Sequence, residues 1–442
     1  MKYQTYREYK IADLGWLNQI PNHWEIKRLK YLGDALIGLT YSPDEVVDEG
    51  EGVLVLRSSN VQKKQLAYDD NVYVNKKVPS KLVTQTGDIL LCARNGSRAL
   101  IGKNAQIDDH AAGMTFGAFM SIFRSPYNNY LSKVFNSPLF ESQSGSFLTA
   151  TINQLTTGNL NSFEIPLPPE VERKKITNFL DHETAKIDTL IEKQQQLIKL
   201  LKEKRQAVIS HAVTKGLNSS VPMRDSGVEW LGEMPAHWEV KSLKFVCEFI
   251  NNKIAIGEKK VIALENIEGW SGKYIKTESS YSGEDVEFKE GDVLFGKLRP
   301  YLAKVFFSKE SGVAFGDLLV YRPGVSIVGR YCFYQMINET FISIVNSSTY
   351  GSKMPRASAE FISDMSILLP PIEEQEKIVA IIDINLNKFD EIESKAKVAI
   401  NLMQERRTAL ISAAVTGKID VRHHTSHPTG SANTIMGDNN EL

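Results

Sequence analysis

The chain has 442 residues, a formal net charge of −1, an apolar fraction of 42% and a charged fraction of 24%. This length is sufficient for two or three domains with sizeable cores, and the composition is that of an ordinary globular protein. Because the charge is nearly neutral, any contact with nucleic acid has to come from local basic patches rather than from a general basic excess.

The cysteine content and the hydropathy pattern indicate a cytoplasmic protein. Cys92, Cys247 and Cys332 are scattered without CxxC spacing, so neither a disulfide framework nor a zinc site is expected. No apolar run approaches the roughly 18 residues of a membrane span. The first ten residues lack the apolar core of a signal peptide. We therefore expect no contact with a membrane.

A tryptophan-rich motif near the start of the chain occurs twice. Residues 16–30 read WLNQIPNHWEIKRLK, and residues 230–244 read WLGEMPAHWEVKSLK, 214 residues later (230 − 16). Such a repeat predicts two related halves, with residues 1–20 forming an N-terminal arm. His23 and His237 occupy matching positions, and we interpret both as half-buried histidines hydrogen-bonded within a structural turn rather than as catalytic groups.

Two bodies of short apolar runs follow the two copies of the motif. Residues 21–167 and residues 235–369 each contain strand-like runs separated by turn signals, which indicates mixed or antiparallel β structure with a few helices. The run Gly-Asp-[Ile/Val]-Leu-[Leu/Phe] begins at residue 87 in the first body and at residue 291 in the second. We therefore expect the two bodies to share a fold while differing in surface.

A long helix is predicted after each body. Residues 168–217 contain neither Pro nor Gly between Pro169 and Gly216, and residues 370–418 repeat the same pattern 202 residues later (370 − 168). An apolar row of period seven on helices of this length needs a partner helix, so we expect the two to pack together as a coiled coil. The packing positions are Leu180, Ile187, Leu201 and Val208 in the first helix and Ile382, Phe389, Met403 and Leu410 in the second, with Leu190, Leu197 and Ile198 widening the first row.

The two remaining segments are polar. Residues 218–234 are predicted to be a linker, and residues 419–442 a disordered tail. His423, His424 and His427 in the tail form a cluster that could bind a metal, but a tail rich in Gly, Ser and Asn is more typical of solvated chain. We expect no metal site.

Motifs that carry enzymatic chemistry are missing from the sequence. It contains no GxxxxGK[ST] loop, no GxGxxG turn after a strand, no HExxH and no GxSxG. It also lacks the Asn/Asp-Pro-Pro-aromatic run with which adenine methyltransferases hold a flipped base. We therefore expect a protein without catalytic residues.

Basic and polar side chains beside predicted turns are the best candidates for a binding surface. Arg, Lys, Asn and Ser reach base edges and phosphates, and a tight turn can present them into a groove. Basic residues in loops are often only solvated, but similar patches at like positions in both bodies favour DNA binding. The candidates are Arg57, Asn60, Lys63, Arg94, Asn95, Ser97, Arg98 and Lys103 in the first body, and Lys297, Arg299, Tyr301, Lys304, Lys353 and Arg356 in the second.

Up to about residue 420, the chain resembles the specificity subunits of Type I restriction–modification systems. The resemblance is carried by the tryptophan motif at residues 230–238 with its degraded first copy, by Pro370-Pro371 before Glu373-Glu374-Gln375, and by two long helices that end in Ala-Val-Thr. The first half departs from the pattern, since Val171-Glu172-Arg173 stands where the second half has Glu373-Glu374-Gln375. This departure concerns a local cap or partner contact.

The resemblance implies an α+β architecture with a pseudo-two-fold internal repeat. Two β-rich target-recognition domains, residues 21–167 and 235–369, would be separated by two long antiparallel coiled-coil helices. Each domain would read one half of a split DNA sequence in the major groove. A helix of about 40 residues extends roughly 60 Å, so the helices would set the gap between the half-sites.

The resemblance also implies the partners. The chain would bind double-stranded DNA, two methyltransferase (M) subunits and restriction (R) subunits, and would bind no cofactor itself. S-adenosylmethionine, ATP and Mg²⁺ would belong to those partner subunits, which flip and methylate an adenine or cut unmethylated DNA. Two other classes stay open on the residues alone: a coiled-coil scaffold whose modules bind peptides or glycans, and a nuclease with dispersed acidic residues.

Overall fold

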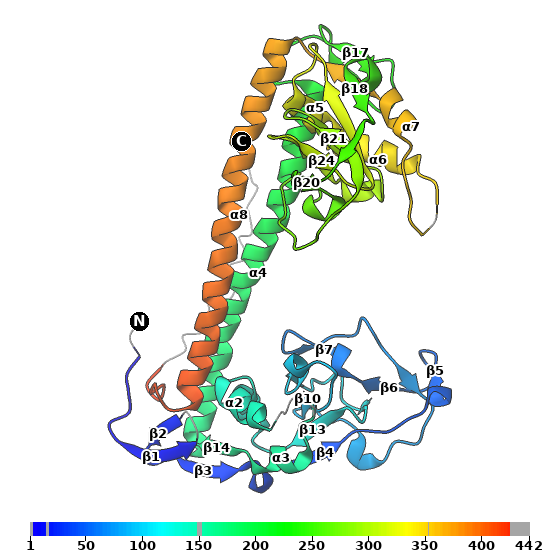
Figure 1. The fold of residues 1–442 in the computed structure, drawn as a ribbon. Helices are drawn as coiled ribbons and strands as arrows, with labels where there is room; N and C mark the ends of the chain where they lie inside the picture. The colour runs from blue at the N-terminus through cyan, green and yellow to red at the C-terminus, as the bar shows by residue number, and fades with distance from the viewer. Residues whose placement is uncertain (1–2, 15–16, 148–152, 352, 425–442) are drawn as a thin grey trace, which may run out of the picture. The chain divides into compact units, whose positions relative to one another are not determined.

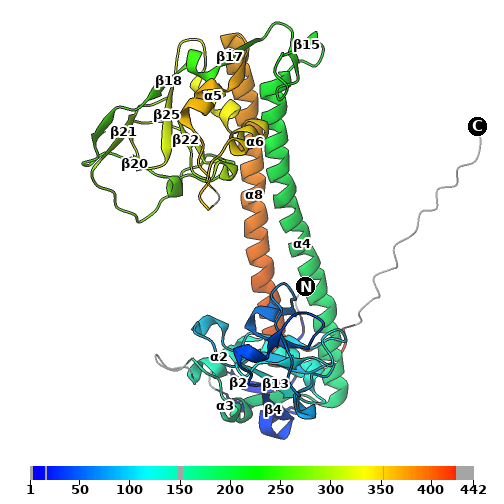
Figure 2. The same cartoon turned by 90° about the vertical axis from the view of Figure 1, so that its right-hand side faces the viewer.

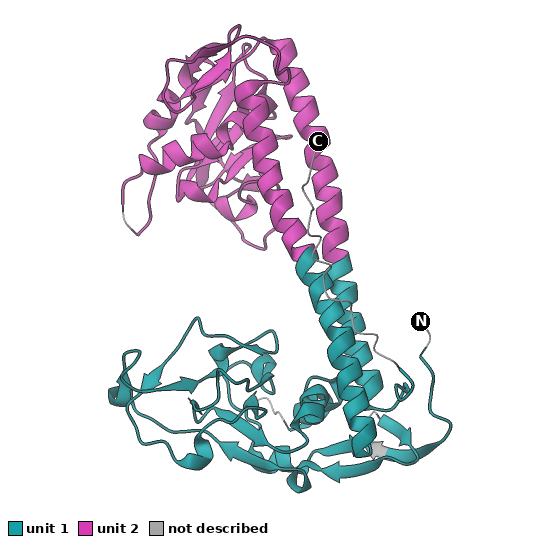
Figure 3. Cartoon of the chain, turned by 180° about the vertical axis from the view of Figure 1, so that it is seen from behind, with its two compact units in different colours: residues 1–193, 399–442 teal, residues 194–398 magenta. Residues whose placement is uncertain are grey.

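The computed structural model describes residues 3–14, 17–147, 153–351 and 353–424 (Figure 1). The chain forms two compact units, unit 1 with residues 1–193 and 399–442, and unit 2 with residues 194–398 (Figure 3). Each unit therefore combines one β-rich body with parts of both long helices. The predicted fold class, an α+β chain with two β-rich bodies and two long helices, is confirmed.

Unit 1 contains two four-stranded sheets, flanked by short two-stranded pairs and helices. One sheet has the order β11-β10-β13-β4 and the other the order β12-β6-β9-β5. The strands of the sheets are β4 (Asp34–Ile37), β5 (Val46–Val47), β6 (Val53–Leu56), β9 (Tyr73–Val74), β10 (Ile89–Cys92), β11 (Asn104–Gln106), β12 (Thr115–Phe116) and β13 (Met120–Arg124). The pairs are β1 (Tyr9–Leu14) with β2 (Leu17–Pro21), β3 (Glu25–Arg28) with β14 (Glu164–Leu167), and β7 (Val61–Gln62) with β8 (Gln65–Leu66). The helices are α1 (Asn128–Phe135), α2 (Pro138–Ser146), α3 (Thr157–Ser162) and residues 170–193 of the 46-residue α4 (Glu170–Lys215).

Unit 2 repeats this plan in the same chain order. Its sheets have the orders β18-β25-β22-β23 and β19-β21-β24-β20. The strands are β18 (Cys247–Ile250), β19 (Lys253–Ala255), β20 (Val261–Ile262), β21 (Glu284–Phe288), β22 (Val293–Gly296), β23 (Val305–Phe307), β24 (Gly312–Ala314) and β25 (Leu318–Pro323). The pairs are β15 (Met223–Asp225) with β16 (Glu233–Pro235), and β17 (Glu239–Ser242) with β26 (Ser366–Leu369). The helices are α5 (Gly329–Met336), α6 (Glu339–Ser347), α7 (Ala359–Asp364) and residues 372–398 of the 44-residue α8 (Ile372–Val415).

The two bodies differ in the second sheet. Both contain a short parallel pair, β6 with β12 in unit 1 and β20 with β24 in unit 2. The strand that extends this pair is attached on different sides in the two units. In unit 1, β9 pairs with β6, the first strand of the pair, whereas in unit 2, β21 pairs with β24, the second strand. The shared fold therefore includes the parallel pair but not the strands beyond it.

The repeated Gly-Asp run has a structural role in both units. Asp88 is buried, and Arg124 donates to it through Nε (2.9 Å) and Nη2 (2.6 Å). Asp292 is equally buried and accepts the same two bonds from Arg322, at 3.0 and 2.8 Å. In each pair, the hydrogen bond to the aspartate raises the pKa of the arginine. Such a two-pronged pair ties the turn before one central strand to the end of its neighbour.

Within each unit, α4 and α8 lie side by side and run antiparallel (Figures 1 and 2). In each unit, one arginine–aspartate ion pair joins the two helices. In unit 1, Arg407 of α8 donates to Asp188 of α4 through Nε (2.8 Å) and Nη2 (3.2 Å). In unit 2, Arg205 of α4 pairs with Asp390 of α8. Both residues of one pair are related to those of the other by the sequence offset of 202, so the contact follows the internal repeat.

Most of the predicted coiled-coil row lies on the packed face. Leu180, Ile187, Ile382 and Leu410 are buried, and Phe389 and Met403 are half-buried against the same cores. Leu201 and Val208 are only half-buried, and Leu190 is 50% exposed. A strict period of seven drifts by about 20° per heptad on a straight α-helix. By the end of α4, the buried positions are therefore Arg205, Ile209 and Val213.

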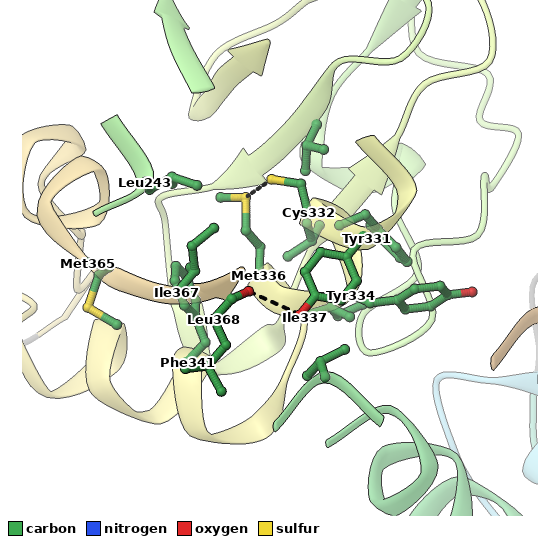
Figure 4. Close-up of a cluster of buried hydrophobic side chains, with 14 of the residues drawn as sticks. Leu243, Tyr331, Cys332, Tyr334, Met336, Ile337, Phe341, Met365, Ile367 and Leu368 are labelled. Atoms are coloured by element: carbon green, nitrogen blue, oxygen red, sulfur yellow. Dashed lines mark hydrogen bonds between the residues drawn. The ribbon is translucent and has the colours of Figure 1, made fainter. Parts of the chain in front are cut away.

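The first helix of each body is fixed to a long helix and to the strand before it. Tyr130 of α1 donates to Pro166 O (2.9 Å), and Tyr331 of α5 donates to Leu368 O (3.0 Å; Figure 4). A second contact uses aspartates 202 residues apart. Lys133 pairs with Asp181, and Arg330 Nη2 donates to Asp383 Oδ1 (2.9 Å). These contacts position each body on its helix pair.

A histidine of each tryptophan motif makes a third contact with a long helix that both units share. His23 Nε2 lies 2.7 Å from Glu172 Oε2, and His237 Nε2 lies 2.7 Å from Glu374 Oε2. Both histidine side chains are about half-exposed, at 41% and 45%. Each histidine is hydrogen-bonded, as predicted, but its partner lies in the first turn of a long helix rather than within the turn of the motif itself. Trp16 lies outside the described residues.

Glu172 of unit 1 is more buried and accepts more hydrogen bonds than Glu374 of unit 2. Glu172 also accepts from Tyr6 Oη (2.5 Å) and Trp24 Nε1 (3.0 Å), and its side chain is 6% exposed. Burial and the bond to Glu172 raise the pKa of Tyr6. Glu374 is 28% exposed, and Trp238 Nε1 is buried without a hydrogen-bond partner among the described residues.

Arg173 of the first half stands where the second half has Gln375, and both side chains make an equivalent hydrogen bond. Gln375 is buried and donates from Nε2 to Pro370 O (2.8 Å). At the equivalent position, Arg173 Nη1 donates to Pro168 O (2.7 Å), and its guanidinium lies over the Tyr127 ring, 4.8 Å from the centroid. Two different side chains thus make the same bond to the residue that precedes the helix.

Two predicted segment boundaries need correction. Residues 218–234, predicted as a linker, contain β15, which pairs with β16 as β1 pairs with β2. The tail was expected to be disordered from residue 419, but Val421 is buried, and Asp420 N donates to Gln4 O (2.7 Å). The apolar Ile419 and Val421 explain this packing. Residues 425–442 of the predicted tail, with His427, lie outside the described residues.

Candidate nucleic-acid interface

In unit 1, three loops meet where β6, β10 and β12 end. They comprise residues 57–60, 93–98 and 117–119, and we call them the unit 1 edge. Gly117 N donates to Leu56 O (3.0 Å), while Ala93 N and Arg94 N both donate to Phe119 O (3.0 and 2.9 Å). The strand ends and these bonds bring segments that are far apart in the sequence onto one surface.

Unit 2 has an equivalent edge, made of residues 263–266, 297–302 and 315–317. Phe315 N donates to Ile262 O (2.8 Å), and Lys297 N donates to Asp317 O (2.9 Å). These bonds are the counterparts of those in unit 1. The backbone therefore places Lys297 where unit 1 has Ala93, and Asp317 where unit 1 has Phe119.

A further segment crosses each edge and extends the equivalence. Isolated β-bridges join Arg94 to Gln154 in unit 1 and Leu298 to Arg356 in unit 2. Next to them, Asn95 N donates to Asn153 O (3.4 Å), and Arg299 N donates to Pro355 O (2.8 Å). Arg94 thus corresponds to Leu298, and Gln154 to Arg356.

Five of the predicted residues of unit 1 lie on or beside the 93–98 loop of its edge. Arg94, Ser97 and Arg98 are exposed, and Asn95 and Lys103 are half-buried. The Arg94 guanidinium lies over the Phe119 ring, 5.3 Å from the centroid. Asn95 Oδ1 accepts from Ser97 N (2.9 Å), which shapes the loop. Lys103 O accepts from Cys92 N (2.8 Å), at the end of β10.

Lys63 lies apart from these residues. It is exposed at the β7–β8 turn, where it adopts a positive φ of 49°. The next residue, Lys64, donates from Nζ to Asn136 O at the end of α1 (3.3 Å), and burial lowers its pKa. The turn is thus directed toward α1, and Lys63 does not belong to the unit 1 edge.

Asn60 requires a correction, because it is fully buried and cannot face DNA. Its Oδ1 accepts from Arg57 N (2.9 Å), and its Nδ2 donates to Ala67 O (2.9 Å). Asn266 does the same in unit 2, where its Oδ1 accepts from Ala263 N (2.9 Å). The asparagine therefore holds a 3₁₀ turn after the strand in both units. Arg57 is half-buried, and its Nη2 donates to Asp70 Oδ1 (2.8 Å).

The predicted residues of unit 2 gather at its edge, but several are engaged within the protein. Lys304 Nζ donates to Leu264 O (2.6 Å), so this lysine is committed to the loop itself. Arg356 donates to Asp317 through Nε and Nη2, both at 3.3 Å, and Lys297 Nζ lies 3.7 Å from the same carboxylate. The bond to Asp317 raises the pKa of Arg356.

Of the other three predicted residues of unit 2, two are exposed and Arg299 is half-buried. Tyr301 is 46% exposed, and Lys353 is exposed. Arg299 has a left-handed backbone, with φ of 50°. A non-glycine residue in this region is uncommon and is held there by its surroundings. The unit 2 edge therefore presents Arg299 and Tyr301 on the constrained 297–302 loop, next to the loop that carries the Asp317 carboxylate.

The chemistry of both edges suits nucleic acid. Guanidinium groups donate to phosphates and to guanine O6 and N7, amides bond to adenine, and lysine ammonium groups contact phosphates. Among the described residues, no group of three or more His, Cys, Asp and Glu side chains is placed to hold a metal ion. Over the same residues, no helix has the length and apolar content needed to cross a bilayer.

Phe119 and Asp317 are residues of the edges that the sequence did not reveal. Phe119 directly precedes the apolar run of β13, so it is easily assigned to the core, yet it is 61% exposed. Asp317 precedes β25 in the same way. The signal that could have identified them is their shared position before equivalent strands, but the two neighbouring sequences are too different to align without the structure.

The sequence is similar to a known family and to several characterised relatives. Residues 235–402 match the model of the Type I restriction modification DNA specificity domain. The chain is 22% identical to the Type I restriction enzyme EcoKI specificity subunit of Escherichia coli strain K12, over 95% of this chain and 94% of that protein. It is 23% identical to the Type I restriction enzyme MjaVIII specificity subunit of Methanocaldococcus jannaschii, over 95% of this chain and 98% of that protein.

Solved structures show a similar fold. One is a chain from a study titled "Structural basis underlying complex assembly and conformational transition of the type I R-M system", with a TM-score of 0.63 and 15% identity, over 90% of this chain and 99% of that chain. Another is the HsdS subunit of Thermoanaerobacter tengcongensis, with a TM-score of 0.51 and 15% identity, over 92% of this chain and all of that chain. The predicted resemblance is confirmed: residues 235–402 match the specificity domain, and the chain is similar over almost its whole length to specificity subunits of Type I restriction–modification systems.

Proposed function

We propose that this chain selects the DNA sequence on which a Type I restriction–modification complex acts. The unit 1 edge contacts one half of a split double-stranded target, and the unit 2 edge contacts the other half. The observation that carries this proposal is the repeated backbone of the two edges, on which equivalent positions hold different side chains. A shared scaffold with different surface groups is what two readers of different half-sites require.

The side chains of the edges divide into two kinds of contact. Arg94, Asn95 and Arg299 lie on loops whose backbones are fixed by hydrogen bonds, which suits contacts with base edges in the major groove. Lys353 and Arg98 are exposed and suit contacts with phosphates, which position a protein without selecting sequence.

The long helices provide surface for partner subunits. Apolar side chains on them remain exposed in each unit: Leu190 (50%) and Leu402 (59%) in unit 1, and Leu200 (52%) and Val398 (55%) in unit 2. Exposed apolar groups along a helix are typical of an interface. We assign this surface to two methyltransferase subunits, with restriction subunits joining the same complex.

The chemistry of the complex belongs to those partners. S-adenosylmethionine would bind to the methyltransferase subunits, and ATP and Mg²⁺ to the subunits that restrict DNA. The chain itself supplies target selection and performs no catalytic step. It would act on DNA in the cytoplasm.

The function is tested by single-molecule sequencing of host DNA with detection of modified bases, with and without this chain. We expect a split motif methylated on adenine in both halves to disappear when the chain is removed. A methyltransferase subunit should also co-purify with the tagged chain. If it co-purifies and the methylation pattern is nevertheless unchanged by removal of the chain, the proposal is wrong.

A further inference from the structure

Phe119 of unit 1 and Asp317 of unit 2 occupy the same backbone position. Phe119 O accepts from Ala93 N and Arg94 N, and Asp317 O accepts from Lys297 N. Each residue directly precedes the strand that pairs with β10 or β22. Because the main chain makes these bonds, the side chain at this position can differ between the units.

The Phe119 side chain supports an arginine. The ring is 61% exposed, and the Arg94 guanidinium lies over its face, 5.3 Å from the centroid. Among the described residues, no carboxylate pairs with this guanidinium. The negative face of an aromatic ring attracts a cation and restricts its rotamers while leaving every N–H donor available.

The Asp317 side chain also supports an arginine, by a different interaction. Arg356 directs Nε and Nη2 at the two carboxylate oxygens, both at 3.3 Å. The aspartate is 24% exposed and the arginine 41% exposed. A carboxylate held against this side of a guanidinium fixes its plane and leaves the remaining N–H donors pointing outward.

The two arginines stand on opposite members of the same bridge. Arg94 is bridged to Gln154, whereas Arg356 is bridged to Leu298. The arginine therefore lies on one segment of the bridge in unit 1 and on the other segment in unit 2. The supporting residue, Phe119 or Asp317, occupies the same backbone position in both units. This retained place, occupied by a ring in one unit and a carboxylate in the other, indicates a common task.

We propose that Phe119 and Asp317 are positioning residues, each of which orients one arginine toward a guanine in the half-site of its own unit. Arg94 and Arg356 would then donate to guanine O6 and N7, the commonest specific contact of arginine with a base. Orienting the guanidinium before DNA binds reduces the entropy lost on binding. This inference rests on the proposed function and adds to it a base and two residues that determine specificity.

The test uses the complex of the full chain with its methyltransferase subunits and a DNA library in which both half-sites are randomised. The variants are Phe119→Leu, Phe119→Tyr and Asp317→Asn, and the readout is the base preference at each position of the bound DNA. Phe119→Leu should reduce one guanine preference in one half-site by about three- to fivefold, and Phe119→Tyr should retain it, since a cation held over a ring contributes modestly. Asp317→Asn should reduce a guanine preference in the other half-site only, by about five- to tenfold, because the charged hydrogen bonds are lost.

Two further variants separate positioning from a general structural role. In an Arg94→Ala background, Phe119→Leu should cause no further loss of preference, because it acts through Arg94. The same holds for Asp317→Asn in an Arg356→Ala background. Additive losses would overturn the proposal, as would unchanged guanine preferences, equal changes in both half-sites, or a wild-type motif without guanine in either half. A wild-type complex that selects no sequence at all would instead contradict the proposed function.

Discussion

Units 1 and 2 make the same contacts to the long helices but present different side chains at their edges. The anchoring aspartates, Asp181 and Asp383, and the histidine partners, Glu172 and Glu374, are related by the same sequence offset. At the edges, by contrast, Phe119 is replaced by Asp317, and Arg94 by Leu298. The comparison shows that the polar contacts to the long helices are shared by both units, while the side chains at equivalent loop positions of the edges differ.

The strongest test of the shared scaffold is the buried aspartate of the Gly-Asp run. We expect Asp88→Ala to destabilise the body of unit 1 by about 3–5 kcal/mol, since it leaves Arg124 without its partner. Asp292→Ala should have a similar effect in unit 2. Hydrogen exchange resolved by peptide reports each unit separately, and the exposed Asp44 replaced by Ala is the control. A large effect in only one unit would mean that the two bodies are not held in the same way.

The second test concerns an anchor that differs between the units. Glu172→Ala should destabilise unit 1 by about 2–4 kcal/mol, because Tyr6 and Trp24 lose a buried acceptor. Glu374→Ala should cost less than about 1 kcal/mol, since this glutamate is more exposed and, among the residues that the structure describes, its side chain bonds only to His237. Chemical denaturation of each variant, monitored by hydrogen exchange, gives the loss in the free energy of unfolding. Equal losses would contradict the difference in burial.

The sequence predicted the parts of the fold that depend on repetition and periodicity. The long helices were predictable because α4 and α8 contain no Gly or Pro, and the related bodies because the Gly-Asp run recurs. The exact packing of α4 was not predictable. On a straight α-helix, positions seven residues apart gradually rotate away from the packed face, so other residues, here Arg205 and Ile209, become buried. The strand β15 was missed because its three residues are all exposed.

The candidate site was predictable in outline but not in detail. Arg94 and Arg299 were found because basic residues in turns are conspicuous. Asn60 was misplaced because an asparagine that caps a turn and one that contacts a base occur in similar sequence surroundings, and the acceptor that binds its amide is seven residues away at Ala67. Asp317 was missed because its partner Arg356 is distant in the sequence.

The third test compares the two pairs that join α4 to α8. Arg205 is 9% exposed, and Asp390 also accepts Lys273 Nζ at 2.7 Å. Arg407 and Asp188 are 24% and 49% exposed. A double-mutant cycle with alanine should give a coupling of about 1 kcal/mol for Arg205–Asp390 and about 0.3–0.5 kcal/mol for Arg407–Asp188. The reverse order would show that burial does not decide the strength of these pairs.

The smallest expected effect is that of a single phosphate contact. Lys353→Ala should weaken DNA binding of the assembled complex about equally for all sequences and should reduce the slope of log affinity against log salt by about 1. Binding titrations at several salt concentrations measure this slope. Lys395→Ala on α8, where Lys395 pairs with Glu391, is the matched control and should leave the slope unchanged. A change of base preference in Lys353→Ala would place this lysine against a base instead.

The central claim, that one scaffold carries two independent readers, is tested most directly by the methylated motif in host DNA. One variant replaces Arg94, Asn95 and Arg98 with alanine, and a second replaces Lys297, Arg299 and Arg356. Single-molecule sequencing of each strain should show one half of the motif relaxed and the other half unchanged, with the altered half exchanged between the two variants. If both halves changed together in each variant, or if the same half changed in both, the assignment of one half-site to each edge would be contradicted.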